Sequence, residues 1–203
     1  MKKIKLYQYK GKLIEVFNLT CPEFNGWLTD SVNFNYYGLL ASFSNKIQNK
    51  IILDLGTSHG YSAFVLGENK KNTVRSYDIE RNHISEEKIK EINTEYPNID
   101  FRLQDCLEIP LEEIKNSSLI FLDIAPYDGI QENKMMQKIR EAEFSGLLVC
   151  DDIGTFFGPG MRGWWESIRE IKYELAGISY AGTGFVFFTE KSYNIFCEEE
   201  EVD

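Results

Sequence analysis

From residue 51 onward, short apolar runs alternate with segments whose apolar residues recur at helical spacing. The runs are rich in β-branched residues and are bounded by turn residues, which is typical of strands buried on both faces of a sheet. Five such runs occupy residues 51–55, 74–78, 99–103, 119–123 and 147–151. Repeated strand–helix alternation predicts a doubly wound α/β fold, with a mostly parallel sheet and helices on both faces.

The segments between these strands carry matching helix signals. Ser85, followed by two glutamates, is a good N-cap, and Pro97 ends the helical run that follows it. Further helices are predicted from residue 62 and through two sets of apolar positions: Met135, Ile139 and Ala142, then Trp164, Ile168 and Ile171. Apolar runs at 177–181 and 185–188, joined by Gly-Thr-Gly at 182–184, predict a closing antiparallel hairpin.

The two ends of the chain differ from this pattern. Residues 4–9 and 12–17 predict a short hairpin, and an aromatic-rich stretch follows it. That stretch fits either a helix pair packed on the domain or a cap over a substrate pocket. We therefore predict three segments: an N-terminal hairpin and helical cap over 1–45, a ligand-binding core over 46–190, and an acidic tail over 191–203.

Length and composition exclude several classes of protein. The chain has 203 residues, which suits one domain, and 43% of them are hydrophobic, enough for a packed core. Its 22 basic and 32 acidic side chains give a net charge of −10, which disfavours a nucleic-acid partner. No apolar run is long enough for a membrane span or a signal peptide, so we expect neither. The four cysteines form no C-x-x-C pair, which disfavours zinc and fits buried thiols in a reducing, cytoplasmic compartment.

Aspartates end the predicted strands with unusual regularity. They are Asp54, Asp78, Asp105, Asp123, Asp151 and Asp152. One such residue is ordinary turn chemistry. In a doubly wound sheet, however, the carboxyl ends of the strands meet at the edge where ligands bind. Acids at five strand ends therefore predict a site, and their mutual repulsion calls for a cation or hydrogen-bond donors.

The turn after the first strand is the best-defined motif. Asp54 precedes a turn with glycines at Gly56 and Gly60, and Asp78 ends the next strand 24 residues later. Such glycines let a backbone approach a ligand, and an acid at that spacing suits ribose hydroxyls. The turn lacks the dinucleotide pattern G-x-G-x-x-G, and a carboxylate at Asp54 repels phosphate but accepts from an ammonium group. The combination favours S-adenosylmethionine (SAM) over a ligand-free turn.

These motifs together resemble those of class I SAM-dependent methyltransferases. The resemblance covers residues 35–190 and rests on IILDLGTSHGYS at 51–62, SYDIE at 76–80, LQDC at 103–106, LIFLD at 119–123 and GLLVCDDI at 146–153. It implies a seven-stranded sheet whose last strand is antiparallel. It also implies that SAM binds at the matching positions: Asp54, Gly56, Thr57, Ser58, Gly60, Ser62, Asp78, Ile79, Asp105 and Cys106.

Within this class, the Gly-Tyr-Ser ending and the Asp-Asp pair resemble small O-methyltransferases of the catechol and sugar types. Many of those enzymes bind a divalent cation. The resemblance implies Asp123, Asp151 and Asp152 as the metal ligands, and oxygen-only ligands suit Mg²⁺ or Ca²⁺. The alternative is that Asp152 caps the following segment and Asp123 meets the substrate directly.

The sequence departs from both types at the general base. The catechol-type lysine is replaced by Pro126, and the sugar-type aspartate by Ala125. Asp123 and His59 are therefore the catalytic candidates, His59 because its imidazole titrates near neutral pH beside the expected sulfonium. The alternative for His59 is an exposed turn residue.

We therefore expect a SAM-dependent methyltransferase that acts on a small-molecule hydroxyl by direct displacement at the methyl carbon. One alternative is a metal-independent methyltransferase acting on an amine or another acceptor. Another is a SAM-binding protein without catalysis, which the missing base motivates. A nicotinamide oxidoreductase is disfavoured by the absent glycine fingerprint. The acceptor and the formation of a homo-oligomer are left open.

Overall fold

The computed structural model describes residues 31–81, 83–175 and 181–197. The hairpin predicted between residues 4 and 17 lies outside the described residues, as does most of the aromatic stretch that follows it. The sheet and the helices that position the candidate site all lie within the described parts.

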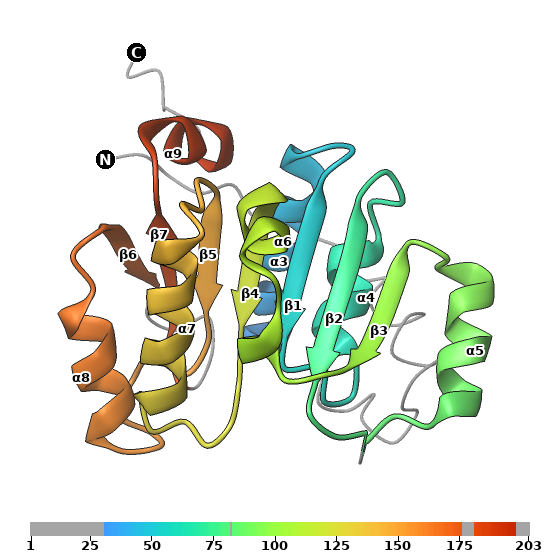
Figure 1. Cartoon of the computed structure of the whole chain (residues 1–203), viewed down its shortest axis with the longest axis horizontal. Coiled ribbons are helices and arrows are strands. Elements are labelled where there is room, and N and C mark those ends of the chain that lie inside the picture. Colours follow the sequence, from blue (N-terminus) through green and yellow to red (C-terminus); the bar gives the residue numbers. More distant parts are fainter. Residues whose placement is uncertain (1–30, 82, 176–180, 198–203) are drawn as a thin grey trace.

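Apolar runs form the strands of one seven-stranded sheet (Figure 1). The strands are β1 Ile51–Leu55, β2 Thr73–Asp78, β3 Ile99–Leu103, β4 Ser117–Leu122, β5 Leu147–Cys150, β6 Ile171–Leu175 and β7 Thr183–Phe187. Their order is β3-β2-β1-β4-β5-β7-β6. The first five are mutually parallel, and β7 runs antiparallel to both β5 and β6. The doubly wound, mostly parallel sheet with an antiparallel C-terminal hairpin is therefore confirmed.

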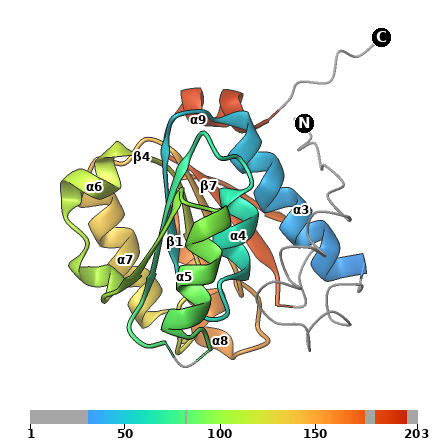
Figure 2. The same cartoon turned by 90° about the vertical axis from the view of Figure 1, so that its right-hand side faces the viewer.

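Helices cover both faces of this sheet (Figure 1 and Figure 2). They are α3 Ser31–Lys46, α4 Tyr61–Gly67, α5 Glu86–Glu95, α6 Leu111–Asn116, α7 Ile130–Glu141, α8 Pro159–Ser167 and α9 Glu190–Phe196, with the short 3-10 helix η2 Cys106–Glu108. Helices α3, α4, α5 and α9 pack in one apolar layer, and α6, α7 and α8 in the other. In the described residues, no helix is long and apolar enough to cross a bilayer.

Strand alternation decides which side chains enter which layer. On β1, Ile52 points to the layer of α3 and α4, whereas Leu53 points to the layer of α6 and α7. Both side chains are fully buried. A strand buried on both faces needs apolar residues at consecutive positions, which explains why these strands are continuous apolar runs in the sequence.

The last predicted helix was wrong at its C-terminal end. Helix α8 ends at Ser167, Ile168 has extended backbone angles, and Ile171 begins strand β6. Residues 171–174 alternate apolar and charged side chains, and Ile171 and Tyr173 are both partly exposed. Because β6 is an edge strand, this period of two gives the better description.

The predicted hairpin was also shifted. The strand that pairs with β7 on its outer side is β6, and residues 177–180 of the predicted first strand lie outside the described residues. Thr183 and Gly184, expected in the turn, are the first residues of β7. A Cβ on Gly184 would lie 2.4 Å from a ring carbon of Trp165. This glycine therefore makes room for an aromatic side chain instead of turning the chain.

Both predicted terminal segments contribute to the core. Helix α3 extends across the boundary at residue 45 and buries Leu39, Leu40 and Phe43 completely. The predicted acidic tail begins with α9, whose N-terminus carries a capping box between Thr189 and Ser192. Phe196 of this helix is 1% exposed and packs edge-on against Phe43, with ring centroids 5.6 Å apart. The division into three segments stays a prediction, but the helical part of the tail belongs to the packed domain.

Candidate functional site

A cavity of about 480 Å³ opens at the carboxyl ends of the parallel strands. Its size falls in the range of about 300–1,000 Å³ that is usual for small-molecule sites. The residues that line it come from the end of β2, from the turns after β1, β2, β3 and β4, and from the starts of η2 and α7. They are Gly56, Ser58, Tyr77, Asp78, Ile79, Glu80, His83, Asp105, Cys106, Leu107, Asp123, Ile124, Ala125, Pro126, Tyr127 and Gln131. Six of the ten residues predicted to bind SAM are among them.

The glycine turn is held close to the neighbouring strands. The backbone N–H groups of Gly56 and Thr57 both donate to the carbonyl oxygen of Tyr77, at 2.9 and 3.1 Å. Gly56 has a φ of +104°, and a Cβ there would lie 1.7 Å from the backbone oxygen of Asp123. Only glycine fits this position, because both the backbone angle and the close approach exclude a side chain.

Asp54 lies beneath this turn and does not line the cavity. Its side chain is fully buried, and its Oδ2 accepts a hydrogen bond of 2.5 Å from Ser76 Oγ, which also bonds Thr57 Oγ1 at 2.6 Å. Burial raises the pKa of Asp54 to about 6, against the opposing effect of the Ser76 and Ser62 hydroxyls. Thr57, Gly60 and Ser62 are likewise buried and absent from the cavity wall. The predicted contact of Asp54 with an ammonium group stays a prediction.

Two carboxylates on the cavity wall organise the loops that carry them. Asp78 Oδ2 accepts from the backbone N–H of Ser58 at 2.8 Å, which ties the end of β2 to the glycine turn. Asp105 Oδ1 accepts from the backbone N–H of Leu107 at 2.8 Å and caps η2. Both acids therefore lie on the cavity wall, and their predicted contacts with ribose and adenine stay a prediction.

Two further predicted cofactor residues on the wall, Ile79 and Cys106, are apolar. Ile79 is 71% exposed beside Asp78. Cys106 is buried behind Asp105, and burial together with Asp105 raises its thiol pKa to about 12. Its thiol is therefore protonated at neutral pH and contributes an apolar surface.

Asp123 faces the cavity from the end of β4. Its Oδ1 is buried and has no hydrogen-bond partner among the described residues. Burial raises the pKa of Asp123 well above its usual value, and the charges of Asp151 and Asp152 raise it further. An unpaired buried carboxylate oxygen on a cavity wall is costly unless a ligand satisfies it, which makes Asp123 the strongest catalytic candidate.

The other two predicted metal ligands, Asp151 and Asp152, do not line the cavity. Asp151 Oδ1 accepts from Thr183 Oγ1 at 3.4 Å, and Asp152 has a φ of +58°. Burial and the charge of Asp151 raise the pKa of Asp152 to about 7. Across the described ranges, no three Asp, Glu, His or Cys side chains are placed so that they would hold a metal ion. The three carboxylates do not fit a metal as they stand.

The two histidines of the chain stack on one another. The rings of His59 and His83 have centroids 4.4 Å apart, and Tyr61 lies on His59 at 5.3 Å. His83 lines the cavity, whereas the predicted candidate His59 does not. His83 follows β2 by five residues, so its position after a strand end is the signal that could have identified it.

Aromatic side chains stand at the cavity edge near Asp123. Tyr127 lines the cavity and stacks on Phe157 with ring centroids 4.5 Å apart. Phe157 and its neighbour Phe156 are 46% and 70% exposed. Both loops directly follow strands that end in predicted site acids, but only the structure shows that they meet.

Comparisons with known proteins agree with this geometry. No protein-family model matches the chain, and a search of curated proteins finds no match. Solved structures do match. The O-methyltransferase TomG of Streptomyces achromogenes, involved in tomaymycin synthesis and solved with SAM, is 16% identical with a TM-score of 0.56, covering 91% of each chain.

Two further solved structures give the same result. The Podospora anserina methyltransferase PaMTH1, bound to S-adenosylhomocysteine (SAH), is 16% identical with a TM-score of 0.59, covering 93% of this chain and 91% of PaMTH1. A methyltransferase from Geobacter sulfurreducens is 12% identical with a TM-score of 0.60, covering 87% of each chain. At these identities the match concerns the fold. The chain therefore has the fold of methyltransferases that bind SAM.

Proposed function

We propose that this protein is a SAM-dependent methyltransferase that transfers a methyl group to a hydroxyl of a small molecule. The observation that carries the proposal is the arrangement of three acids around one cavity. Asp78 and Asp105 stand on its β2 and β3 side, and Asp123, with its unpaired oxygen, stands on the β4 side. The fold shared with SAM- and SAH-bound methyltransferases supports the same assignment.

The residues on the β2 and β3 side suit an adenosine group. Asp78 lies at the end of β2, where a carboxylate accepts hydrogen bonds from ribose hydroxyls. Asp105 and the apolar surfaces of Ile79 and Cys106 form the wall beside it. The glycine turn brings backbone close to the same space, so that the methionyl end would lie against the cavity wall that Gly56 and Asp123 form together.

Bound SAM supplies an electrophilic methyl carbon on a positively charged sulfur and becomes SAH after transfer. Asp123 would accept a hydrogen bond from the acceptor hydroxyl and hold it in line with the methyl group, because alignment of the reacting atoms is the main requirement. As the oxygen–methyl bond forms, Asp123 takes the hydroxyl proton. Its raised pKa makes it a stronger base than an ordinary carboxylate, and its negative neighbours favour the protonated product.

The described carboxylates do not fit a metal, so we derive no step through one. The mutual repulsion that raises the pKa of Asp123 and Asp152 would instead be relieved by the positive sulfur of the cofactor, which favours the ionised carboxylates. This assignment favours the metal-independent form of the reaction over the Mg²⁺- or Ca²⁺-assisted form that the sequence resemblance implies.

Turnover measured against a panel of acceptors tests the proposal. SAM is incubated with the protein and with catechols, sugars or primary amines, with and without EDTA, and SAH is quantified by mass spectrometry. We expect SAH to accumulate with a hydroxylated acceptor and to do so equally in EDTA. Turnover with amines alone would overturn the hydroxyl assignment, and loss of turnover in EDTA would overturn the metal-free route. Tight SAH binding without turnover for any acceptor would indicate a SAM-binding protein without catalysis.

A further inference from the structure

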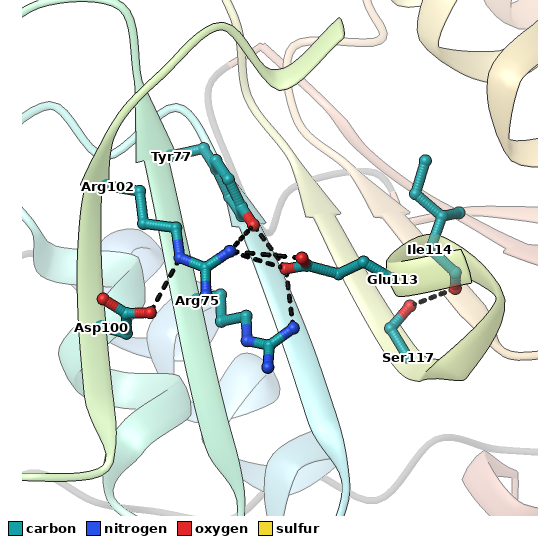
Figure 3. A network of polar contacts seen from close by, with 7 residues as sticks. All are labelled: Arg75, Tyr77, Asp100, Arg102, Glu113, Ile114 and Ser117. Carbon is teal, nitrogen blue, oxygen red and sulfur yellow. Dashed lines mark hydrogen bonds and ion pairs between the residues drawn. The ribbon is translucent and has the colours of Figure 1, made fainter. Parts of the chain in front are cut away.

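A half-buried ionic network lies behind the cofactor cavity, on the face of the sheet covered by α6 (Figure 3). Its centre is Glu113, whose side chain is 12% exposed. Arg75 Nη1 donates to Glu113 Oε1 at 2.9 Å, and Arg102 Nη1 donates to its two oxygens at 3.1 and 3.2 Å. The hydroxyl of Tyr77 also donates to Glu113 and accepts from Arg102 Nη1 at 2.5 Å. The Glu113 carboxylate thus accepts hydrogen bonds from three side chains.

The network joins three elements, of which β2 contributes residues to the cavity wall. Arg75 and Tyr77 lie on β2, and their cross-strand partners on β3 are Asp100 and Arg102. Arg102 Nε donates to Asp100 at 2.8 Å, which fixes the guanidinium from its other side. Glu113 belongs to α6, so its carboxylate links this helix to β2 through Arg75 and Tyr77 and to β3 through Arg102.

Tyr77 connects this network to the cavity wall. The residue is 1% exposed and lines the cavity, and its carbonyl oxygen accepts from the N–H groups of Gly56 and Thr57. The next residue is Asp78, the acid placed for the ribose. A displacement of the Tyr77 ring would therefore move the glycine turn and the ribose acid together.

Helix α6 connects the same network to the side of the cavity that we assign to adenine. The segment Asp105, Cys106 and Leu107 lines the cavity and leads directly into α6. Five residues separate Leu107 from Glu113. Lys138 of α7 donates to the carbonyl oxygen of Leu107 at 2.8 Å and holds the segment from its far end. The separation between the ribose acid and the adenine segment thus depends on how α6 is held to β2.

The charges of the network keep Glu113 ionised. Burial raises its pKa, but the hydrogen bonds from Tyr77 and Arg75 and the charge of Arg102 outweigh burial, so that the pKa lies below its usual value. Removing the negative charge would leave Arg75 and Arg102 with only Asp100 as an acidic partner in the network. Uncompensated charges of this kind are expected to separate, and α6 would shift with them.

We propose that Glu113 is a positioning residue for the cofactor: it sets the width of the adenosine half of the cavity by clamping α6 to Tyr77 and Arg102. The inference rests on the proposed function, since it assigns the adenosine group to this half of the cavity. Glu113 itself does not line the cavity.

Calorimetric titration of the full chain tests the proposal, with SAH and adenosine as separate probes. Glu113→Gln keeps the shape of the side chain but removes its charge. We expect the Kd for SAH to rise about tenfold, the factor that corresponds to one lost charge-assisted hydrogen bond. The Kd for adenosine should rise by the same factor, because only the adenosine half is disturbed. The matched control is Glu112→Gln, since Glu112 is exposed on the same helix and, among the described residues, accepts a hydrogen bond from Asn116 alone.

A merely structural role gives a different result. It would lower the melting temperature of Glu113→Gln while the folded protein bound SAH with unchanged Kd, and that outcome would overturn the proposal. Wild-type protein that fails to bind SAH would instead overturn the proposed function. If Glu113→Gln does not fold, Tyr77→Phe removes one arm of the clamp and keeps the ring, and its Kd for SAH should rise about threefold or more. Wild-type affinity in that variant would also overturn the proposal.

Discussion

The buried carboxylate of Asp54 gives a prediction whose size follows from the structure. Asp54 is fully buried beneath the glycine turn, and one of its oxygens, Oδ1, has no hydrogen-bond partner in the described part of the chain. Substituting Asp54→Asn keeps the size of the side chain and its acceptor for the Ser76 hydroxyl, but removes the ionisation. The variant therefore isolates the free energy of carrying a charge at this place.

The magnitude follows from the pKa of the carboxyl. Burial raises this pKa from 3.8 to about 6, and about 1.4 kcal/mol corresponds to each pKa unit. Well below pH 4 the group is protonated in both the folded and the unfolded chain, so it contributes no pH dependence. Above about pH 7 it is ionised in both, and the buried charge then costs about 3 kcal/mol. Wild-type stability should therefore fall by most of this amount, relative to Asp54→Asn, as the pH rises from 4 to 7.

Urea unfolding of both proteins between pH 4 and pH 8 measures this difference. Any constant offset between the two chains cancels, because only the change with pH is compared. Ser76→Ala is a second test. Without the hydroxyl that favours the ionised form of Asp54, the loss of stability with rising pH should extend to higher pH. A difference between wild type and Asp54→Asn that varies by less than about 0.5 kcal/mol over this range would refute the reasoning.

Three further predictions concern other parts of the fold and site. Gly56→Ala should destabilise the protein by about 3 kcal/mol or more in urea unfolding, because its Cβ would collide with the Asp123 carbonyl; Gly163→Ala, with nothing within 4 Å of its Cβ, should be neutral or stabilising. Asp123→Asn should reduce kcat about 100-fold or more while the Kd for SAH changes less than about threefold, and equal loss of both would count against the assigned role. Ser85→Ala should cost about 1 kcal/mol of stability, because the Ser85 hydroxyl accepts from the backbone N–H of Lys88 at the start of α5; unchanged unfolding would show that this cap contributes nothing.

The central sheet could be predicted from the sequence because its strands are buried on both faces. Nearly continuous apolar runs such as β1 and β5 are typical of strands that are buried on both faces. The edge strand β6 was harder to predict. Residues 171–174 alternate in polarity but follow a helical stretch, so the apolar spacing of Trp164, Ile168 and Ile171 matched a longer helix equally well.

The candidate site was predicted as a set of strand ends but not in its detail. Which face an acid points to depends on strand parity and register. Asp54 pairs with Ser76 across β1 and β2, and both lie in the layer opposite Tyr77, which explains why Asp54 is buried beneath the turn. The stacking of His59 on His83 and of Tyr127 on Phe157 joins loops that are distant in sequence, and no local pattern encodes such contacts.

The central claim is that the cavity at the carboxyl ends of β1, β2, β3 and β4 binds SAM through its adenosine half. The most direct measurement is a calorimetric titration with SAH of the wild-type protein, Asp78→Ala and the control Glu141→Gln, whose side chain is exposed on α7. We expect micromolar binding by the wild type and the control, and at least about tenfold weaker binding by Asp78→Ala. Absence of binding by the wild type, or equal binding by Asp78→Ala, would show that this cavity does not hold the adenosine group of SAM.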